Sequence, residues 1–284
     1  MKNTFFLFLF IISQLFISQS FSQTTGPESG TLLIIGGNAS DSLFIPAFKK
    51  LAGGDSAEIV IIPTARDDES IATDPDFKTL RDRFAKFQFK KISILHTRSV
   101  EDANDPEFVK PLQTATGVWI QGGRQWRLVD SYLNTLTHLE IFGVLHRRGV
   151  VAGTSAGATI QGSYLARGDT KKNTIMMGDH EEGFSFIKNI AIDQHLLARN
   201  RHFDMFEILK NKPHLLGIGL DENTAIVVNG NKFEVIGEHY VAVYDKTRWS
   251  QERDTIYKLK PTSKEFYFLK PGDQYDLLKR TVIE

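Results

Sequence analysis

Apolar and amphipathic stretches alternate along the chain from residue 31 to about residue 152. Continuous apolar runs, typical of strands buried on both faces, occur at 31–35, 57–62, 92–95, 117–120 and 150–152. Apolar residues at three- and four-residue spacing, which predict helices, occur between them at 40–51, 76–87, 106–114, 125–134 and 139–147. This alternation predicts an α/β fold with βαβ units, a parallel sheet and helices on both of its faces.

The pattern changes in the last third of the chain. Short strand-like runs follow one another there, at 218–220, 225–228, 232–236, 240–244 and 265–269. Asn229 and Gly230 separate two of these runs, and this dipeptide favours a two-residue β-hairpin. We expect a few antiparallel C-terminal strands that extend the sheet or form a small β layer. No repeat or low-complexity linker is present, so residues 23–284 are expected to form a single domain.

Glycines follow several of the predicted parallel strands. Gly36 and Gly37 come after the first strand, Gly122 and Gly123 after the fourth, and Gly153 lies at the end of the fifth. Ligands of open parallel sheets bind beyond the carboxyl ends of the strands. The functional site is therefore expected at this edge of the sheet.

Residues 1–22 have the pattern of a secretory signal peptide. A basic start at residues 1–3 precedes a Phe-rich apolar run at 4–17, and Ser20 and Ser22 are the small residues that a signal peptidase recognises. A retained membrane anchor is the alternative, but the run is shorter than the ~20 residues that a spanning helix needs. The sequence predicts export to the periplasm or the cell exterior, with no membrane association after cleavage.

Composition excludes some classes of function. Lys plus Arg and Asp plus Glu both number 34, so no net charge attracts nucleic acid or an acidic membrane. The chain has no cysteine, which excludes disulfides, a thiol nucleophile and thiolate metal ligands.

The segment 153–157, Gly-Thr-Ser-Ala-Gly, carries the strongest chemical signal. It has the form G-x-S-x-G between a predicted strand and a helix-compatible stretch at 156–161. A tight strand-to-helix turn exposes the serine hydroxyl, and this context predicts Ser155 as a nucleophile. The amide of Ala156 is then a candidate oxyanion donor. The alternative is a glycine-rich turn in which Ser155 only caps a helix.

His195 is the candidate base for this nucleophile. It lies 40 positions after Ser155, at the end of an apolar run and next to Asp193 and Gln194. A neutral imidazole there can take the serine proton and return it to the leaving group. Arg199 and Arg201 follow; they either grip a substrate carboxylate or are ordinary surface charges.

Two other segments have less certain roles. Gly122 and Gly123 precede a predicted helix, so their amides are candidates for a second oxyanion donor, and Gln125 for a substrate hydrogen bond. An ordinary glycine turn is the alternative, and phosphate binding is disfavoured because neither phosphate-binding glycine motif is present. The 163–190 segment is a lid or a surface loop, and the adjacent acids around His180 do not have metal-site spacing.

Five motifs together resemble the cyanophycinase and aspartyl dipeptidase (dipeptidase E) family of serine peptidases, and cyanophycinases most closely. Their order and spacing match the family from residue 32 to about residue 245. The range begins with residues 32–37, and the five matching segments are 62–65, 121–125, 153–158, 193–201 and 217–225.

The resemblance implies a flavodoxin-like fold of the class I glutamine amidotransferase type, usually as a homodimer, with no metal or organic cofactor. It implies Ser155 as nucleophile and His195 as base. It also implies hydrolysis of the β-aspartyl-arginine bonds of cyanophycin, or of related aspartyl peptides. The positions expected to shape the substrate pocket are Gln125, Asp193, Gln194, Arg199 and Arg201.

The chain departs from the family pattern at two places. The family has an acid a little over twenty positions before the histidine, where residues 170–173 carry no carboxylate. Asp169 is the nearest acid and our candidate for orienting the histidine, with Glu181 and Glu182 as alternatives. Near position 204, where cyanophycinases tend to carry an arginine, this chain has Asp204.

Two competing functions remain at this point. A catalytically dead or weak exported protein would keep the pocket for peptide binding without the acid. An α/β-hydrolase esterase shares G-x-S-x-G, but its histidine normally lies nearer the C-terminus and it adds an HGGG-type oxyanion motif, which this chain lacks.

Overall fold

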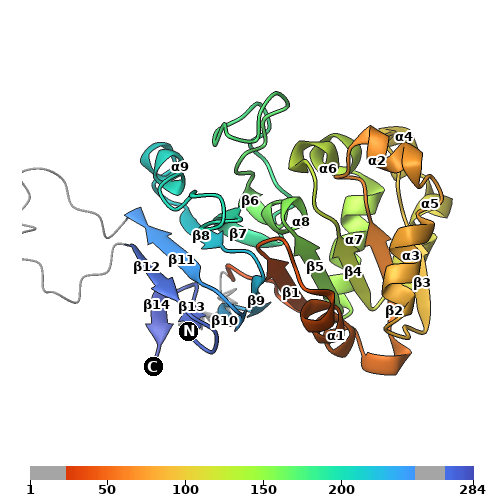
Figure 1. The fold of residues 1–284 in the computed structure, drawn as a ribbon, viewed down its shortest axis with the longest axis horizontal. Helices are drawn as coiled ribbons and strands as arrows, with labels where there is room; N and C mark the ends of the chain where they lie inside the picture. The colour runs from red at the N-terminus through yellow and green to blue at the C-terminus, as the bar shows by residue number, and fades with distance from the viewer. Residues whose placement is uncertain (1–23, 247–265) are drawn as a thin grey trace, which may run out of the picture.

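The computed structural model describes residues 24–246 and 266–284 (Figure 1). The predicted signal peptide, residues 1–22, lies outside these ranges. No helix within the described ranges has the length and apolar character needed to cross a bilayer.

The described strands form two sheets. The larger, of nine strands, has the order β14-β13-β10-β9-β1-β5-β4-β2-β3. Its strands are β1 (Thr31–Ile35), β2 (Glu58–Ile62), β3 (Lys91–Ile94), β4 (Gly117–Ile120), β5 (Val150–Thr154), β9 (Thr224–Asn229), β10 (Lys232–Gly237), β13 (Gln274–Asp276) and β14 (Thr281–Ile283). The five strands β1, β5, β4, β2 and β3 are parallel, and β9 joins β1 in antiparallel register.

The smaller sheet has five strands in the order β12-β11-β8-β7-β6. These are β6 (Gly162–Tyr164), β7 (Ile187–Gln194), β8 (Leu216–Leu220), β11 (Val241–Asp245) and β12 (Phe266–Leu269). Here β6, β7 and β8 run parallel, whereas β11 pairs with both β8 and β12 in antiparallel register. The sequence left open whether the C-terminal strands extend the main sheet or form a separate β layer. Both occur: some of these strands extend the main sheet, and others complete a second one.

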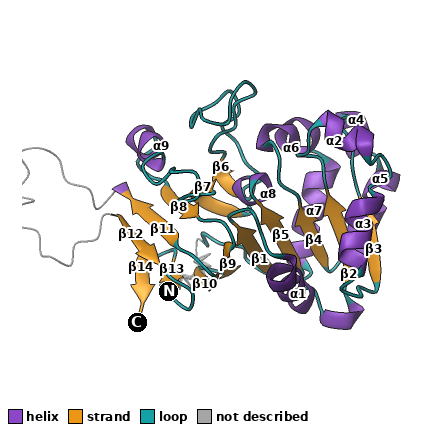
Figure 2. Cartoon of the chain, in the orientation of Figure 1, coloured by secondary structure: helices purple, strands orange, loops and turns teal. Residues whose placement is uncertain are grey.

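Helices cover both faces of the larger sheet, as expected (Figure 2). They are α1 (Asp41–Leu51), η1 (Gly54–Ser56), α2 (Asp68–Thr73), α3 (Lys78–Ala85), α4 (Val100–Ala103), α5 (Pro106–Thr114), α6 (Gln125–Tyr132), α7 (Leu136–His146), α8 (Ala156–Thr159) and α9 (Met205–Asn211). Side chains alternate along a strand, so Leu33 of β1 packs with α1 and α3, whereas Leu32 faces α5 to α7.

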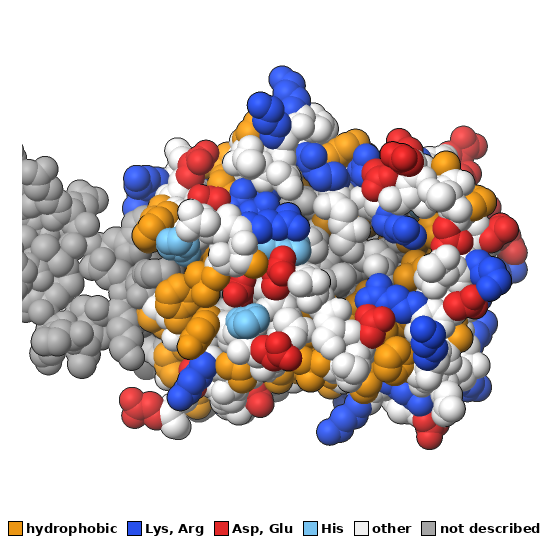
Figure 3. Space-filling model, viewed as in Figure 1, with side chains coloured by type: hydrophobic (Ala, Val, Ile, Leu, Met, Phe, Trp, Pro, Cys, Tyr) orange, Lys and Arg blue, Asp and Glu red, His pale blue; other side chains and the backbone are white. Residues whose placement is uncertain are grey.

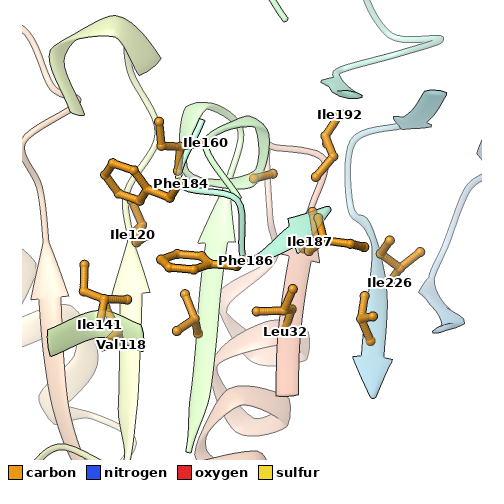
Figure 4. Packing of buried hydrophobic residues seen from close by; sticks show 14 of the residues in the cluster. Leu32, Val118, Ile120, Ile141, Ile160, Phe184, Phe186, Ile187, Ile192 and Ile226 are labelled. Atoms are coloured by element: carbon orange, nitrogen blue, oxygen red, sulfur yellow. The ribbon is translucent and has the colours of Figure 1, made fainter. Parts of the chain in front are cut away.

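The second sheet is joined to the first through the apolar layer that contains Leu32. Phe184 and Phe186 lie fully or almost fully buried between strands of the main sheet and the start of β7. Figure 4 shows both rings beside Ile120 and Ile141, with Ile187 next to Leu32. This shared core packs the start of β7 against β1 of the larger sheet.

The sequence predictions and the structure agree on the longer elements. The hairpin at Asn229 and Gly230 is confirmed, since β9 pairs with β10 and Gly230 adopts a left-handed φ of 53°. The α/β architecture with a flavodoxin-like parallel core is also confirmed. The short helices α2 and α4 and the three-residue strands were not predicted.

Candidate active site

Ser155 occupies a strained turn between β5 and α8. Its backbone has φ 55° and ψ −113°, a left-handed region that a non-glycine residue adopts only when its surroundings impose it. The flanking glycines are required by packing, because a Cβ on Gly153 would lie 2.0 Å from the Gly157 carbonyl oxygen. The hydroxyl forms no capping bond to α8. The alternative, in which Ser155 only caps a helix, is therefore wrong.

His195 follows the last residue of β7 and contacts the serine. Its Nε2 lies 2.9 Å from Ser155 Oγ, and its Nδ1 lies 2.6 Å from Oε1 of Glu222. The imidazole is buried, with 5% of the residue exposed. Hydroxyl, imidazole and carboxylate therefore form one continuous hydrogen-bonded chain, the geometry by which a serine nucleophile is activated.

Glu222 corrects the expectation for the acid. Asp169 does not reach the histidine; its carboxylate accepts hydrogen bonds from the amides of Lys171 and Lys172 and closes a local turn. Glu181 and Glu182, the two alternatives for this acid, are not bound to His195 either. Glu181 binds the Lys212 ammonium at 3.0 Å, and Glu182 is exposed.

A sequence signal for Glu222 was present. Asp221, Glu222 and Asn223 directly follow β8, which ends at the same edge as the other catalytic strands. The segment 217–225, which contains Glu222, also belongs to the family pattern. That pattern has its acid between serine and histidine, whereas Glu222 follows both in the chain.

Each of the three residues after β8 has a separate task. The carboxylate of Asp221 accepts bonds from the amides of Leu197 and Ala198, both at 3.0 Å, and so fixes the turn that follows His195. Glu222 binds the imidazole. The amide of Asn223 donates to the Gly37 carbonyl at 2.9 Å, which joins this segment to the end of β1.

The carboxyl end of β1 holds the catalytic groups together. The carbonyls of Ile35, Gly36 and Gly37 accept bonds from the amides of Ser155 (3.0 Å), His195 (2.9 Å) and Asn223 (2.9 Å), respectively. A Cβ on Gly37 would lie 2.3 Å from His195 Cε1, and Gly37 has φ 118°. Glycine is needed here both for the backbone conformation and for the approach of the imidazole.

Burial and charge prepare His195 to act as a base. Desolvation lowers the pKa of His195 below its usual 6.5, with Arg199 and Arg201 acting in the same direction, while the bond to Glu222 opposes them. The imidazole is therefore neutral at neutral pH. The pKa of Glu222 is also lowered: burial opposes ionisation, but hydrogen bonds from His195 and Asn38 outweigh it.

The predicted oxyanion donors lie around the serine. A Cβ on Gly122 would lie 3.6 Å from Ser155 Oγ, so this glycine turn packs directly against the nucleophile. Gly123 has φ 145°, and a Cβ there would lie 2.0 Å from the Ala65 carbonyl oxygen. The turn thus places Gly122 against the nucleophile, with Gly123 next in the chain, while Ala156 follows Ser155 at the first turn of α8.

Several expected pocket residues are brought together, but not all face the nucleophile. Gln194 Oε1 lies 3.4 Å from Ser155 Oγ and 3.3 Å from Arg201 Nη1. Arg201 is itself buried, and burial together with Arg167 lowers its pKa to about 10. Arg199 is exposed. Figure 3 shows basic, acidic and histidine side chains gathered near the centre of this face, beyond the strand ends.

Asp193 and Gln125 have roles within the fold. Arg167 binds both oxygens of Asp193 at 2.8 Å and one oxygen of Asp204 at 2.5 Å; the Arg167 and Asp193 side chains are both 1% exposed. The amide nitrogen of Gln125 donates to the carbonyls of Ala166 and Arg167. These side chains support the segment behind the site, and in this structure their polar groups are occupied by the protein.

The described residues contain no cluster of three or more His, Asp or Glu side chains able to hold a metal ion. His180 instead binds two aspartates, Asp130 at 2.8 Å and Asp179 at 2.9 Å. The contact with Asp130 attaches the connection between β6 and β7, which Figure 1 shows projecting away from the sheets, to helix α6.

Comparisons with known proteins agree with this geometry. Residues 32–236 match the model of Peptidase family S51. The chain is 27% identical over 286 residues to a cyanophycinase of Nostoc sp., covering 94% of this chain and 92% of that protein. It is 30% identical over 224 residues to a cyanophycinase of Geminocystis herdmanii, covering 76% of this chain and 80% of that protein.

Two solved structures share the fold. A peptidase from an acI-B1 actinobacterium superimposes with a TM-score of 0.65 at 23% identity, covering 87% of this chain and 97% of that one. A peptidase E-like protein of Listeria monocytogenes gives a TM-score of 0.53 at 15% identity, covering 74% of this chain and 100% of that one.

Proposed function

Because this chain belongs to peptidase family S51 and is a serine-type peptidase, we propose that it is an exported enzyme that cleaves β-aspartyl-arginine or related aspartyl peptide bonds. The observation that carries the mechanism is the continuous contact from Ser155 through His195 to Glu222. The substrate class rests on the similarity to cyanophycinases.

In the first half of the reaction, Ser155 Oγ attacks the carbonyl carbon of the scissile bond. His195 Nε2 takes the hydroxyl proton as the bond forms, and Glu222 stabilises the resulting imidazolium through Nδ1–H. The negative charge on the former carbonyl oxygen is held by the backbone amides of Gly123 and Ala156. The imidazolium then protonates the leaving amine, which departs and leaves an acyl-enzyme.

In the second half, water replaces the amine. His195 removes a proton from the water, the hydroxide adds to the ester carbon, and the tetrahedral intermediate collapses. The proton returns to Ser155 as the acyl group leaves as a carboxylic acid. The neutral imidazole favoured by burial is the form required at the start of each half.

Substrate recognition is expected to depend on Arg199. This guanidinium is exposed beside the catalytic pair and acts electrostatically on both His195 and Glu222. A guanidinium binds carboxylates in a bidentate manner, so Arg199 suits a substrate that carries a free carboxylate near the scissile bond. Arg201, which is bound to Gln194, is better placed to hold that side chain than to bind substrate.

Export and homodimer formation belong to the same proposal. The signal-peptide pattern at residues 1–22 supports export, and the absence of cysteine is compatible with an oxidising compartment. The homodimer is proposed from the family resemblance, and sedimentation of the mature chain at several concentrations tests it.

The decisive experiment compares the mature protein with Ser155→Ala on cyanophycin and on β-Asp-Arg peptides. The proposal expects dipeptide release by the wild type only. A protein that hydrolyses neither substrate but reacts at Ser155 with a fluorophosphonate would be a hydrolase with another peptide substrate. No hydrolysis and no labelling would favour the peptide-binding alternative. The contact between Glu222 and His195 argues against that alternative.

A further inference from the structure

We propose that Asn38 is a positioning residue that holds Glu222 in the orientation needed by His195. This inference rests on the serine mechanism proposed above, but not on the identity of the substrate. Its basis is a fourth member of the hydrogen-bonded chain: Asn38 Nδ2 lies 2.9 Å from Glu222 Oε2, while the other carboxylate oxygen binds His195 at 2.6 Å.

The backbone places Asn38 opposite the carboxylate. Asn38 directly follows the glycine pair after β1 and has a left-handed φ of 40°, a conformation that asparagine tolerates better than most residues. The two segments are joined on either side of this contact. Gly37 accepts from the Asn223 amide, and the Asn223 side chain accepts from the Ser40 amide, both at 2.9 Å.

The contact has a chemical consequence. The terminal torsion of a glutamate is broad and two-fold, so an unsupported carboxylate can rotate away from the imidazole. The Asn38 amide binds one oxygen and leaves the other for His195 Nδ1. Because the donor is neutral and the acceptor charged, the bond also favours ionised Glu222, which is the form that stabilises the imidazolium.

Other groups act on the same pair and must be considered in any titration. Arg199 faces both His195 and Glu222, and Arg201 faces His195. The two guanidiniums disfavour the imidazolium, whereas Glu222 favours it. Asn38 therefore acts on this balance through the position and ionisation of Glu222, and its removal changes neither guanidinium.

The test measures fluorophosphonate labelling of Ser155 as a function of pH in the wild type, Asn38→Ala and Asn38→Asp. Labelling does not depend on the peptide substrate, so failure to cleave cyanophycin leaves this test intact. We expect the plateau rate to fall about tenfold in both variants, a typical result of losing one positioning bond to a charged group. A matched control is Asn134→Ala, since Asn134 is exposed with φ 60° and lies outside the site.

The acid limb of the profile separates positioning from a structural role. In Asn38→Ala the Glu222 carboxylate can rotate away and stabilises the imidazolium less. The pKa of His195 therefore falls, and the limb moves to lower pH. In Asn38→Asp a second negative charge favours the imidazolium, so the limb moves to higher pH. Limbs that stay at the wild-type pH in both variants, or a rate loss matched by Asn134→Ala, would overturn the proposal.

A second measurement covers a protein that does not label. The hydrogen-bonded His195 Nδ1–H gives a far-downfield proton resonance whose intensity reports the His195–Glu222 contact directly. We expect it in the wild type and expect it to broaden or vanish in Asn38→Ala. Its retention in a folded Asn38→Ala protein would contradict the proposal, whatever the catalytic result.

Discussion

Three consecutive carbonyls, those of Ile35, Gly36 and Gly37, hold the catalytic residues by their backbones. The amides they accept belong to Ser155, His195 and Asn223, the neighbour of Glu222. The relative positions of the nucleophile, base and acid are therefore set by main-chain geometry at the end of one buried strand, and each side chain needs only its own rotamer to complete the contact.

Glu222→Gln tests the acid at the level of one atom. The amide keeps the shape of the side chain but cannot stabilise the imidazolium as a carboxylate does, so kcat should fall by about 10³- to 10⁴-fold. Asp169→Asn is the control because its carboxylate closes a local turn, and its kcat should stay within about twofold. Steady-state peptide hydrolysis measures both, and equal losses in the two variants would refute the assignment of Glu222.

Gly37→Ala tests the approach of the imidazole to the backbone. The added Cβ would lie 2.3 Å from the ring, which forces His195 away from Ser155. A displacement of this size should reduce kcat/KM by about 100-fold. Gly53→Ala is a matched control, because φ is 106° there and the nearest atom to the new Cβ is 3.7 Å away. If both variants lose activity equally, backbone strain and not ring displacement is the cause.

At the scale of elements, the connection between β6 and β7 carries a histidine whose protonation should affect its attachment. His180 lies between Asp130 and Asp179; the bond to Asp130 attaches the connection to α6, and the bond to Asp179 lies within the connection. Burial opposes a charge on His180, but the two aspartates outweigh it and raise its pKa above the usual 6.5.

The raised pKa gives this attachment a predictable pH dependence. A group with a raised folded-state pKa stabilises the attached state fully below its unfolded value and loses that contribution as pH rises through the folded value. Hydrogen exchange in residues 168–181 should therefore accelerate as pH rises above about 6.5, after correction for intrinsic exchange. His180→Gln should exchange fast at every pH; a slope as steep as in the wild type would show that another group is responsible.

Some strands could be predicted from the sequence alone, and others could not. The runs that became β1, β2, β4 and β5 are apolar and continuous because these strands are covered on both faces, and that pattern is visible without a structure. Strands of three residues, such as β6 and β13, are too short to show a period. Their formation depends on partners distant in the chain.

The site was predictable to a similar degree. Ser155 was found because G-x-S-x-G between a strand and a helix has a local geometric meaning, and His195 because it follows an apolar run. Glu222 was not predicted because its contact with His195 depends on the pairing of β7 with β8, two strands that are separated in the sequence. Asp193 was expected in the pocket because the sequence does not show that Arg167 folds back onto it.

For the whole molecule, the buried charges of Arg167 and Asp193 join three parts of the chain behind the active site. Arg167 lies after β6, Asp193 near the end of β7, and Asp204 just before α9. The hydrogen bonds to Asp193 and Asp204 outweigh desolvation and raise the pKa of Arg167, so the guanidinium stays charged in the core. Such a group is tolerated only while its partners remain in place.

Arg167→Leu should consequently reduce the free energy of unfolding by about 3–5 kcal/mol, because it leaves the Asp193 carboxylate buried without its partner. Adding Asp193→Leu should recover part of the loss, since it removes the buried unpaired carboxylate, although Asp204 and Arg201 then each lose an ion-pair partner. Lys78→Met is the surface control: the Lys78 and Asp82 side chains are 79% and 57% exposed, so the change should stay within about 0.5 kcal/mol. Urea denaturation of the mature chain measures all three, and a double variant less stable than Arg167→Leu would mean that Asp193 is held mainly by its other contacts, the Gln194 amide and Arg201.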